Sequence, residues 1–163
     1  MSTIDERLRA ASGYLDLGMI TDAADELDLI DPSERVHLEV IRMRAVIYFN
    51  TGHWALLKIF SSMLVLAEPQ TAENWLWLAF ANRRCDSISE AAATLTRALA
   101  LHPSDPLIHY NLAAYAALSG DLALCRKRLS SAIRLDPELR KTAIDDDDLL
   151  PLWTADILTP HSS

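Results

Sequence analysis

Apolar residues recur at steps of three and four along most of the chain, which is the pattern of helices that bury one face. Between residues 87 and 103, for example, Ile88, Ala91, Leu95 and Ala98 follow this spacing. Alternating runs of β-branched residues and Asn-Gly turns, which would indicate strands, are missing from the sequence. The pattern therefore predicts an all-α chain.

The apolar pattern repeats with a period of 34 residues. Residues 75–79 align with residues 109–113, and Pro69, Pro103 and Pro137 are each 34 positions apart. A fixed period of this length is typical of repeat proteins in which each unit is a pair of helices. The sequence therefore predicts stacked helix pairs.

Local signals mark where these helices begin and end. Gly52 and Gly120 are 68 positions apart, twice the period, and we expect both at turns between paired helices. Ser87, three residues before a glutamate, is typical of a helix N-cap. Asp105 followed by Pro106 predicts another N-cap with proline in the first turn.

These positions resemble a tetratricopeptide repeat, whose pattern is Trp-x2-Leu-Gly-x2-Tyr, then Ala-x3-Phe and a closing Pro. The matching residues are Trp75, Leu78, Ala79, Ala91, Leu95 and Pro103. The next unit departs from the pattern with His109 in the Trp place. The resemblance implies a right-handed superhelix (α-solenoid) of antiparallel helix pairs, with about four repeat-like units and a C-terminal capping helix.

We expect one tetratricopeptide-like domain over residues 1–158, followed by a frayed tail at 159–163. The domain would contain a first unit at 1–32, repeats at 33–70, 71–104 and 105–138, and a C-terminal cap at 139–158. Pro32 lies 37 residues before Pro69, three more than the period, so the first unit is predicted to be irregular.

The net charge of −8 argues against a nucleic-acid partner. An acidic chain repels phosphates, and we identify no basic stripe that offsets this repulsion. No apolar stretch reaches the ~20 residues that a membrane helix needs, and the N-terminus lacks the basic and apolar regions of a signal peptide. We therefore expect a cytoplasmic protein without a membrane partner. Two cysteines are too few for a disulfide framework, and Cys125 is predicted to be a buried thiol.

The sequence contains no catalytic constellation. Gly-rich phosphate loops, Gly-x-Ser-x-Gly and His-Glu-x-x-His are all missing, so we predict that the chain is not an enzyme and has no cofactor. The four acids at 145–148 lack the alternation and the glycine of a calcium loop. We expect no metal there, but solvated acids at the start of a short capping helix.

The resemblance also implies a binding site, because the first helix of each repeat in this family lines a concave groove. The residues that we place in the groove are Arg42, Met43, Phe49, Leu76, Trp77, Phe80, Arg83, Arg84, Tyr110 and Asn111. Aromatic residues and arginines dominate binding hot spots, and arginine can hold a carboxylate through two hydrogen bonds. We therefore expect a partner peptide or helix with an apolar anchor and an acidic neighbour.

Self-covering is the alternative for this groove. The chain's own ends or a second copy could cover the aromatic residues, so a homodimer is possible, and the acidic C-terminal stretch is a candidate occupant.

Three functions compete. The first is a protein-interaction scaffold that binds a peptide or helical segment. The second is a dedicated chaperone of an exported protein, similar to the tetratricopeptide chaperones of type III secretion translocators. The third, an enzyme or enzyme accessory, has no motif in its favour.

Overall fold

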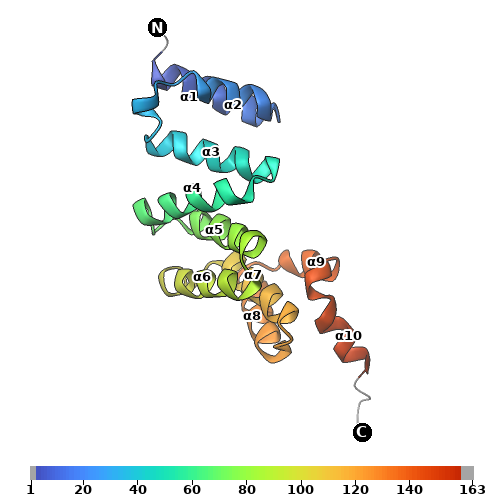
Figure 1. Ribbon diagram of the computed structural model, residues 1–163. Helices are drawn as coiled ribbons and strands as arrows, with labels where there is room; N and C mark the ends of the chain where they lie inside the picture. The colour runs from blue at the N-terminus through green and yellow to red at the C-terminus, as the bar shows by residue number, and fades with distance from the viewer. Residues whose placement is uncertain (1–2, 159–163) are drawn as a thin grey trace. The chain divides into compact units, whose positions relative to one another are not determined.

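The structure is a computed structural model that describes residues 3–158, and these residues form helices without any β-strand. The expected tail at 159–163 lies outside them. The helices, shown in Figure 1, are α1 (Ile4–Asp16), α2 (Ile20–Asp28), α3 (Leu38–Thr51), α4 (Trp54–Ala67), α5 (Ala72–Cys85), α6 (Ile88–Leu101), α7 (Pro106–Leu118), α8 (Leu122–Leu135), α9 (Leu139–Ile144) and α10 (Leu150–Leu158). Two short 3-10 helices, η1 (Pro32–Glu34) and η2 (Asp147–Leu149), complete the described chain.

The 34-residue period is present in the helix boundaries themselves. Helices α1, α3, α5 and α7 begin at residues 4, 38, 72 and 106, and helices α2, α4, α6 and α8 begin at residues 20, 54, 88 and 122. The first pair therefore keeps the period at both of its helix starts. Its irregularity lies at its end, where α2 stops at Asp28 and η1 occupies the longer connection to α3.

The predicted helix ends are confirmed. The Ser87 hydroxyl accepts a hydrogen bond from the Glu90 N–H at 3.1 Å. The Asp105 carboxylate accepts the N–H groups of the second and third residues of α7. Gly52 and Gly120 have φ values of 73° and 81°, in the left-handed region that favours glycine. Ser87 and Asp105 therefore start helices, and Gly52 and Gly120 lie at turns after helices, as the sequence predicts.

The chain divides into two compact units, residues 1–81 and 82–163, with the division inside α5. In the first unit, α1, α2 and α3 enclose an apolar core around Leu27, Val40 and Ile47. A second core lies between α3 and α4, around Ala45 and Leu57. Both cores use the apolar stripes that the sequence pattern predicts.

The core of the second unit joins α7 and α8 to the C-terminal segment. Ala113, Cys125 and Leu129 lie in one buried cluster with Leu149 of η2 and Leu152 of α10. The predicted burial of Cys125 is confirmed, because its exposed fraction is 0%. The C-terminal segment is therefore part of the core of this unit.

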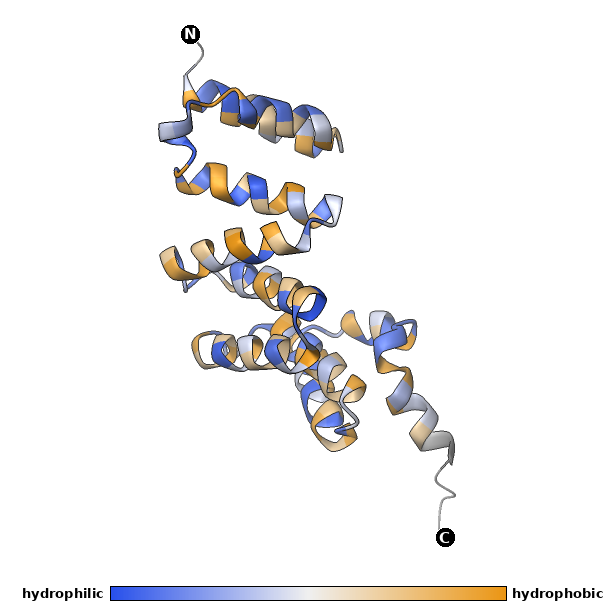
Figure 2. Cartoon of the chain, viewed as in Figure 1, coloured by the Kyte–Doolittle hydropathy of each residue, from blue (hydrophilic) through white to orange (hydrophobic). Residues whose placement is uncertain are grey.

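One helix of the first unit also carries an apolar stripe on its exposed side. Leu56, Ile59, Met63 and Leu66 of α4 are exposed and follow steps of three and four. Figure 2 shows much of α4 in the colours of apolar residues. Within residues 3–158, however, no helix combines the length and the apolar content required to cross a membrane.

Candidate functional site

Two carboxylates of the C-terminal segment are bound by predicted groove residues of the second unit. Arg83 of α5 donates from Nη2 to Oδ1 of Asp148 at 2.8 Å, and its Nη1 donates to the other oxygen of the same carboxylate. Such two-pronged pairs are stronger and more specific than single contacts. The hydrogen bond that Arg83 donates to Asp148 raises the pKa of Arg83 more than partial burial lowers it, so the guanidinium stays charged.

An aromatic ring supports Arg83 from α7. The guanidinium carbon lies 5.8 Å from the ring centroid of Tyr115, a distance at which a cation is attracted to the ring face. Burial raises the pKa of Tyr115 to about 12, with Arg83 opposing this shift. Tyr115 was not among the groove residues predicted from the sequence.

The second carboxylate is held by Tyr110 of α7. Its hydroxyl donates to Oδ2 of Asp146 at 2.6 Å, and the residue is only 7% exposed. Burial and then this hydrogen bond raise the pKa of Tyr110 above its ordinary value. The other oxygen of Asp146 accepts the N–H of Asp148 at 2.9 Å, so the same carboxylate also starts η2.

The prediction that the four acids are solvated is thus wrong for Asp146 and Asp148. Asp145 and Asp147 are exposed, as expected, whereas the other two are half-buried against α5 and α7. The expected start of a short helix is confirmed, because Asp146 caps η2.

Apolar side chains complete this contact. Leu149, which directly follows the bound acids, is 0% exposed, and Leu152 is 2% exposed. The indole of Trp153 donates to the carbonyl of Ala143 at 3.2 Å. Within the second unit, the segment 146–152 is therefore held in place by two carboxylates and two leucines.

The other predicted groove residues of this unit are Arg84, at the end of α5, and Asn111, in α7. Arg84 is exposed. Asn111 is half-buried, and its side-chain amide donates to the carbonyl of Leu107 within the same helix at 2.8 Å. The structure brings Arg83 and Tyr110 to one bound segment, whereas the side-chain amide of Asn111 donates within its own helix.

In the first unit, Arg42 is engaged within the chain. It donates to the Glu68 carboxylate, lies 3.5 Å from a Glu39 oxygen and bonds the Asn74 side chain at 3.3 Å. Burial opposes its charge, but the acidic partners outweigh this effect and raise the pKa of Arg42. A ligand would have to compete with these partners.

The predicted aromatic residues of the first unit lie against or beside one core. Phe49 and Phe80 are in contact, with ring centroids 5.0 Å apart, and the Trp54 ring lies 5.5 Å from that of Phe80. Trp77 and Phe80 both pack against the core between α3 and α4.

Two apolar groove candidates of this unit remain. Met43 packs against the core formed by α1, α2 and α3, and Leu76 is half-buried. Among the apolar groove candidates of this unit, Phe49 is exposed, with 37% of its surface accessible to solvent.

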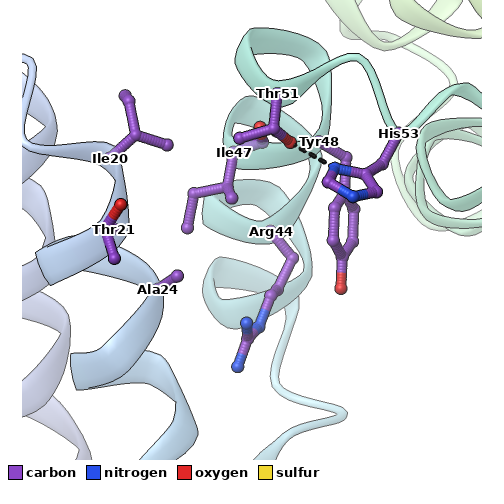
Figure 3. A pocket seen from close by; sticks show the side chains of 8 residues that line it. All are labelled: Ile20, Thr21, Ala24, Arg44, Ile47, Tyr48, Thr51 and His53. Carbon is purple, nitrogen blue, oxygen red and sulfur yellow. Dashed lines mark hydrogen bonds between the residues drawn. The ribbon is translucent and has the colours of Figure 1, made fainter.

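The first unit also contains a pocket that the sequence analysis did not identify. It lies between α2 and α3, has a volume of about 230 Å³ and is shown in Figure 3. Its lining residues are Ile20, Thr21, Ala24, Arg44, Ile47, Tyr48, Thr51 and His53. The Thr51 hydroxyl and His53 Nδ1 form a 2.6 Å hydrogen bond at its rim, and Arg44 pairs with Asp28. The walls of the pocket are mostly apolar. Apolar residues form no recognisable functional motif, so this pocket could not be predicted from the sequence.

No cluster of three potential ligands for a metal ion exists among the described histidine, cysteine, aspartate and glutamate residues.

Comparison with known proteins adds two findings. Residues 72–115 match the family model described as a tetratricopeptide repeat. Among curated proteins, none matches the sequence.

Solved structures share the fold at low sequence identity. MamA from Desulfovibrio magneticus RS-1 superposes with a TM-score of 0.74 at 14% identity, covering 82% of this chain and 76% of that chain. Another crystal structure of MamA gives a TM-score of 0.74 at 16% identity, covering 97% and 87%. TTC0263, a thermophilic TPR protein in Thermus thermophilus, gives 0.69 at 18% identity, covering 93% and 82%.

These solved structures establish the fold class, and the matched segment contains the repeat on which the sequence analysis was based. Residues 72–115 therefore resemble a tetratricopeptide repeat by sequence, and the described chain has the α-solenoid fold of tetratricopeptide-repeat proteins.

Proposed function

We propose that this chain is a protein-interaction scaffold that binds an acidic peptide segment of a partner at Arg83 and Tyr110. The fold supports a scaffold in general, since tetratricopeptide repeats present helix faces to other proteins. The residues of the second unit support the finer proposal. It is a narrower site than the ten-residue groove predicted from the sequence.

One observation carries this proposal: the site already holds an acidic segment of its own chain. Two carboxylates at positions 146 and 148 meet an arginine and a tyrosine, and a fully buried leucine follows at 149. A partner segment with two acids two residues apart and a following leucine offers the same groups. The partner would replace the C-terminal segment, which competes from within the chain at a millimolar-order effective concentration.

The test uses the full chain and a labelled peptide with the sequence of residues 145–153. Asp146→Asn with Asp148→Asn weakens the internal competitor, so this variant should bind the added peptide about tenfold more tightly than the parent does. Adding Arg83→Gln and Tyr110→Phe should remove the gain, because both donors to the peptide carboxylates are then lost. Fluorescence anisotropy measures the binding.

A matched control is available in the same segment. Asp145→Asn with Asp147→Asn removes the same charge from two exposed residues, and it should leave peptide binding at the parent's level. Equal gains in both double variants would mean that general charge, rather than the Arg83 and Tyr110 contacts, controls binding. No gain in either would refute the site. Circular dichroism establishes that each variant keeps its helices.

The export-chaperone alternative and the homodimer stay untested predictions, and no observed contact favours either over the scaffold.

A further inference from the structure

Helices α8 and α9 carry a basic cluster that the analysis of whole-chain charge did not reveal. Residues 122–144 contain six lysines and arginines but only two acids, although the net charge of the whole chain is −8. Averaging over the whole chain conceals the cluster. Short-range charge matters for binding, because salt screens charges that are farther apart than about 8 Å at physiological ionic strength.

Two adjoining pockets lie along this cluster in the second unit. One, of about 290 Å³, is lined by Arg126, Leu129, Ser130, Ile133, Leu152 and Trp153. The other, of about 430 Å³, is lined by Ser130, Ile133, Arg134, Pro137 and Arg140. Because Ser130 and Ile133 line both pockets, the two form one continuous surface. Its first half is mostly apolar and its second half carries two arginines.

The acids closest in sequence to the two arginines have other partners. The Glu138 carboxylate pairs with Lys141 at 2.7 Å, and a carboxylate oxygen of Asp136 accepts the Glu138 N–H at 3.1 Å. Within residues 3–158, neither Arg134 nor Arg140 forms an ion pair. Both guanidinium groups therefore line the pocket with their charge uncompensated by a described side chain.

We propose that this surface binds an acidic segment of a protein partner that also carries an apolar side chain. Arg134 and Arg140 bind its carboxylates through charge-assisted hydrogen bonds. The apolar side chain enters the neighbouring pocket against Ile133, Leu152 and Trp153, where a large apolar residue removes area from water. The arginines of this surface differ from Arg83, but Leu152 and Trp153 belong to the C-terminal segment that Arg83 and Tyr110 hold, so the surface is complete only while that segment stays in place.

A protein segment fits better than a nucleic acid for two reasons. The apolar half of the surface suits an aliphatic or aromatic side chain, which a sugar-phosphate backbone does not supply. The whole chain is acidic, with a net charge of −8, and this opposes the approach of a long polyanion more than that of a short mixed peptide.

The experiment is a selection of displayed random short peptides on the full chain. Peptides are then measured by anisotropy on the parent and on Arg134→Glu with Arg140→Glu. We expect the selected peptides to combine acidic residues with a leucine, phenylalanine or tryptophan. The double variant should bind them about tenfold more weakly or worse, and replacing their apolar residue by serine should weaken binding similarly.

The choice of variants separates this surface from general charge and from the Arg83 site. Arg9→Glu with Arg97→Glu makes the same change in charge at two exposed residues that lie outside the basic cluster and line neither pocket, and it should leave binding unchanged. Neither Arg134 nor Arg140 takes part in the contacts that hold Asp146 and Asp148, so this result and the Proposed function can fail independently.

Several outcomes overturn the inference. Selected peptides without acids, equal binding to both charge-reversed variants, or no enrichment of any peptide would each do so. Tighter binding of a single-stranded oligonucleotide than of the selected peptides, lost in Arg134→Glu with Arg140→Glu, would assign the surface to nucleic acid instead.

Discussion

At the scale of single residues, one departure from the family pattern keeps the interaction of the residue it replaces. Trp75 donates from its indole nitrogen to the carbonyl of Pro69 at 2.8 Å. His109, 34 positions later, places Nε2 2.9 Å from the carbonyl of Pro103, which is itself 34 positions after Pro69. A carbonyl only accepts, so Nε2 carries the proton. The sequence showed the substitution, but only the structure shows why the repeat tolerates it.

Tyr115 gives a prediction about pH. Burial raises its pKa to about 12, whereas tyrosine in an unfolded chain titrates near ~10. Its neutral form is therefore favoured by folding. This contribution to stability is complete below pH ~10 and is lost as the pH rises from ~10 towards 12. The Tyr115→Phe variant should lose less stability over this range than the parent, as measured by urea unfolding at each pH.

Tyrosinate absorbance provides a separate check. At a pH near 11, Tyr115→Phe and the folded parent should absorb almost equally, because the residue that was removed was still un-ionised. If the variant instead lost a full share of the absorbance at that pH, Tyr115 would titrate as an ordinary tyrosine and the argument from burial would be wrong.

The two cysteines give a second prediction at this scale. Cys125 is 0% exposed and burial raises the pKa of its thiol, whereas Cys85 is exposed. Thiolates react and buried thiols do not. A thiol reagent should therefore modify one cysteine per folded chain and two in denaturant. Cys85→Ser should abolish the fast reaction, and rapid labelling of that variant would contradict the buried position of Cys125.

At the scale of helices, the sequence predicted the parts that depend on local signals. Helix starts and ends depend on contacts within a few residues. The sequence shows them as periodic apolar residues, as the caps Ser87 and Asp105, and as glycines at turns. The attachment of η2 was not predictable in the same way. The partners Arg83 and Asp148 are 65 positions apart, and no local pattern selects that pair from the other acids.

Close packing between helices gives a prediction for α7. Ala113 is 0% exposed and lies in the cluster that joins α7, α8 and the C-terminal segment. Ala113→Leu adds three carbons to a filled space and should lower the free energy of unfolding by ~1–3 kcal/mol. Ala123→Leu on the exposed side of α8 is the control and should change stability by less than ~0.5 kcal/mol. Chemical denaturation measures both, and equal midpoints would show that Ala113 is not in a tight contact.

At the scale of the whole molecule, the fold was predictable because the period is a property of the entire chain. Each helix pair repeats the same spacing, so a departure from the family pattern at one position, such as His109, is outweighed by the positions that match. The site was predictable only in part. Arg83 and Tyr110 were identified correctly as residues that bind a segment, whereas Met43 and Trp77 pack against cores. The prediction could not separate these cases, because helix periodicity places a residue on a face without showing which neighbour covers that face.

Separate apolar cores lead to the last prediction. Leu27 is 0% exposed in the core of α1, α2 and α3, and Leu129 is 5% exposed in the core of α7, α8 and the C-terminal segment. Truncating a buried leucine to alanine costs about 2–5 kcal/mol, and in repeat proteins each unit depends chiefly on its nearest neighbours. Leu27→Ala should therefore speed amide hydrogen exchange in α1 and α2 and leave α7 and α8 protected. Leu129→Ala should do the reverse, which makes each variant the control for the other. Faster exchange throughout the chain in both variants would mean that the cores unfold together, and the local account of stability would then be wrong.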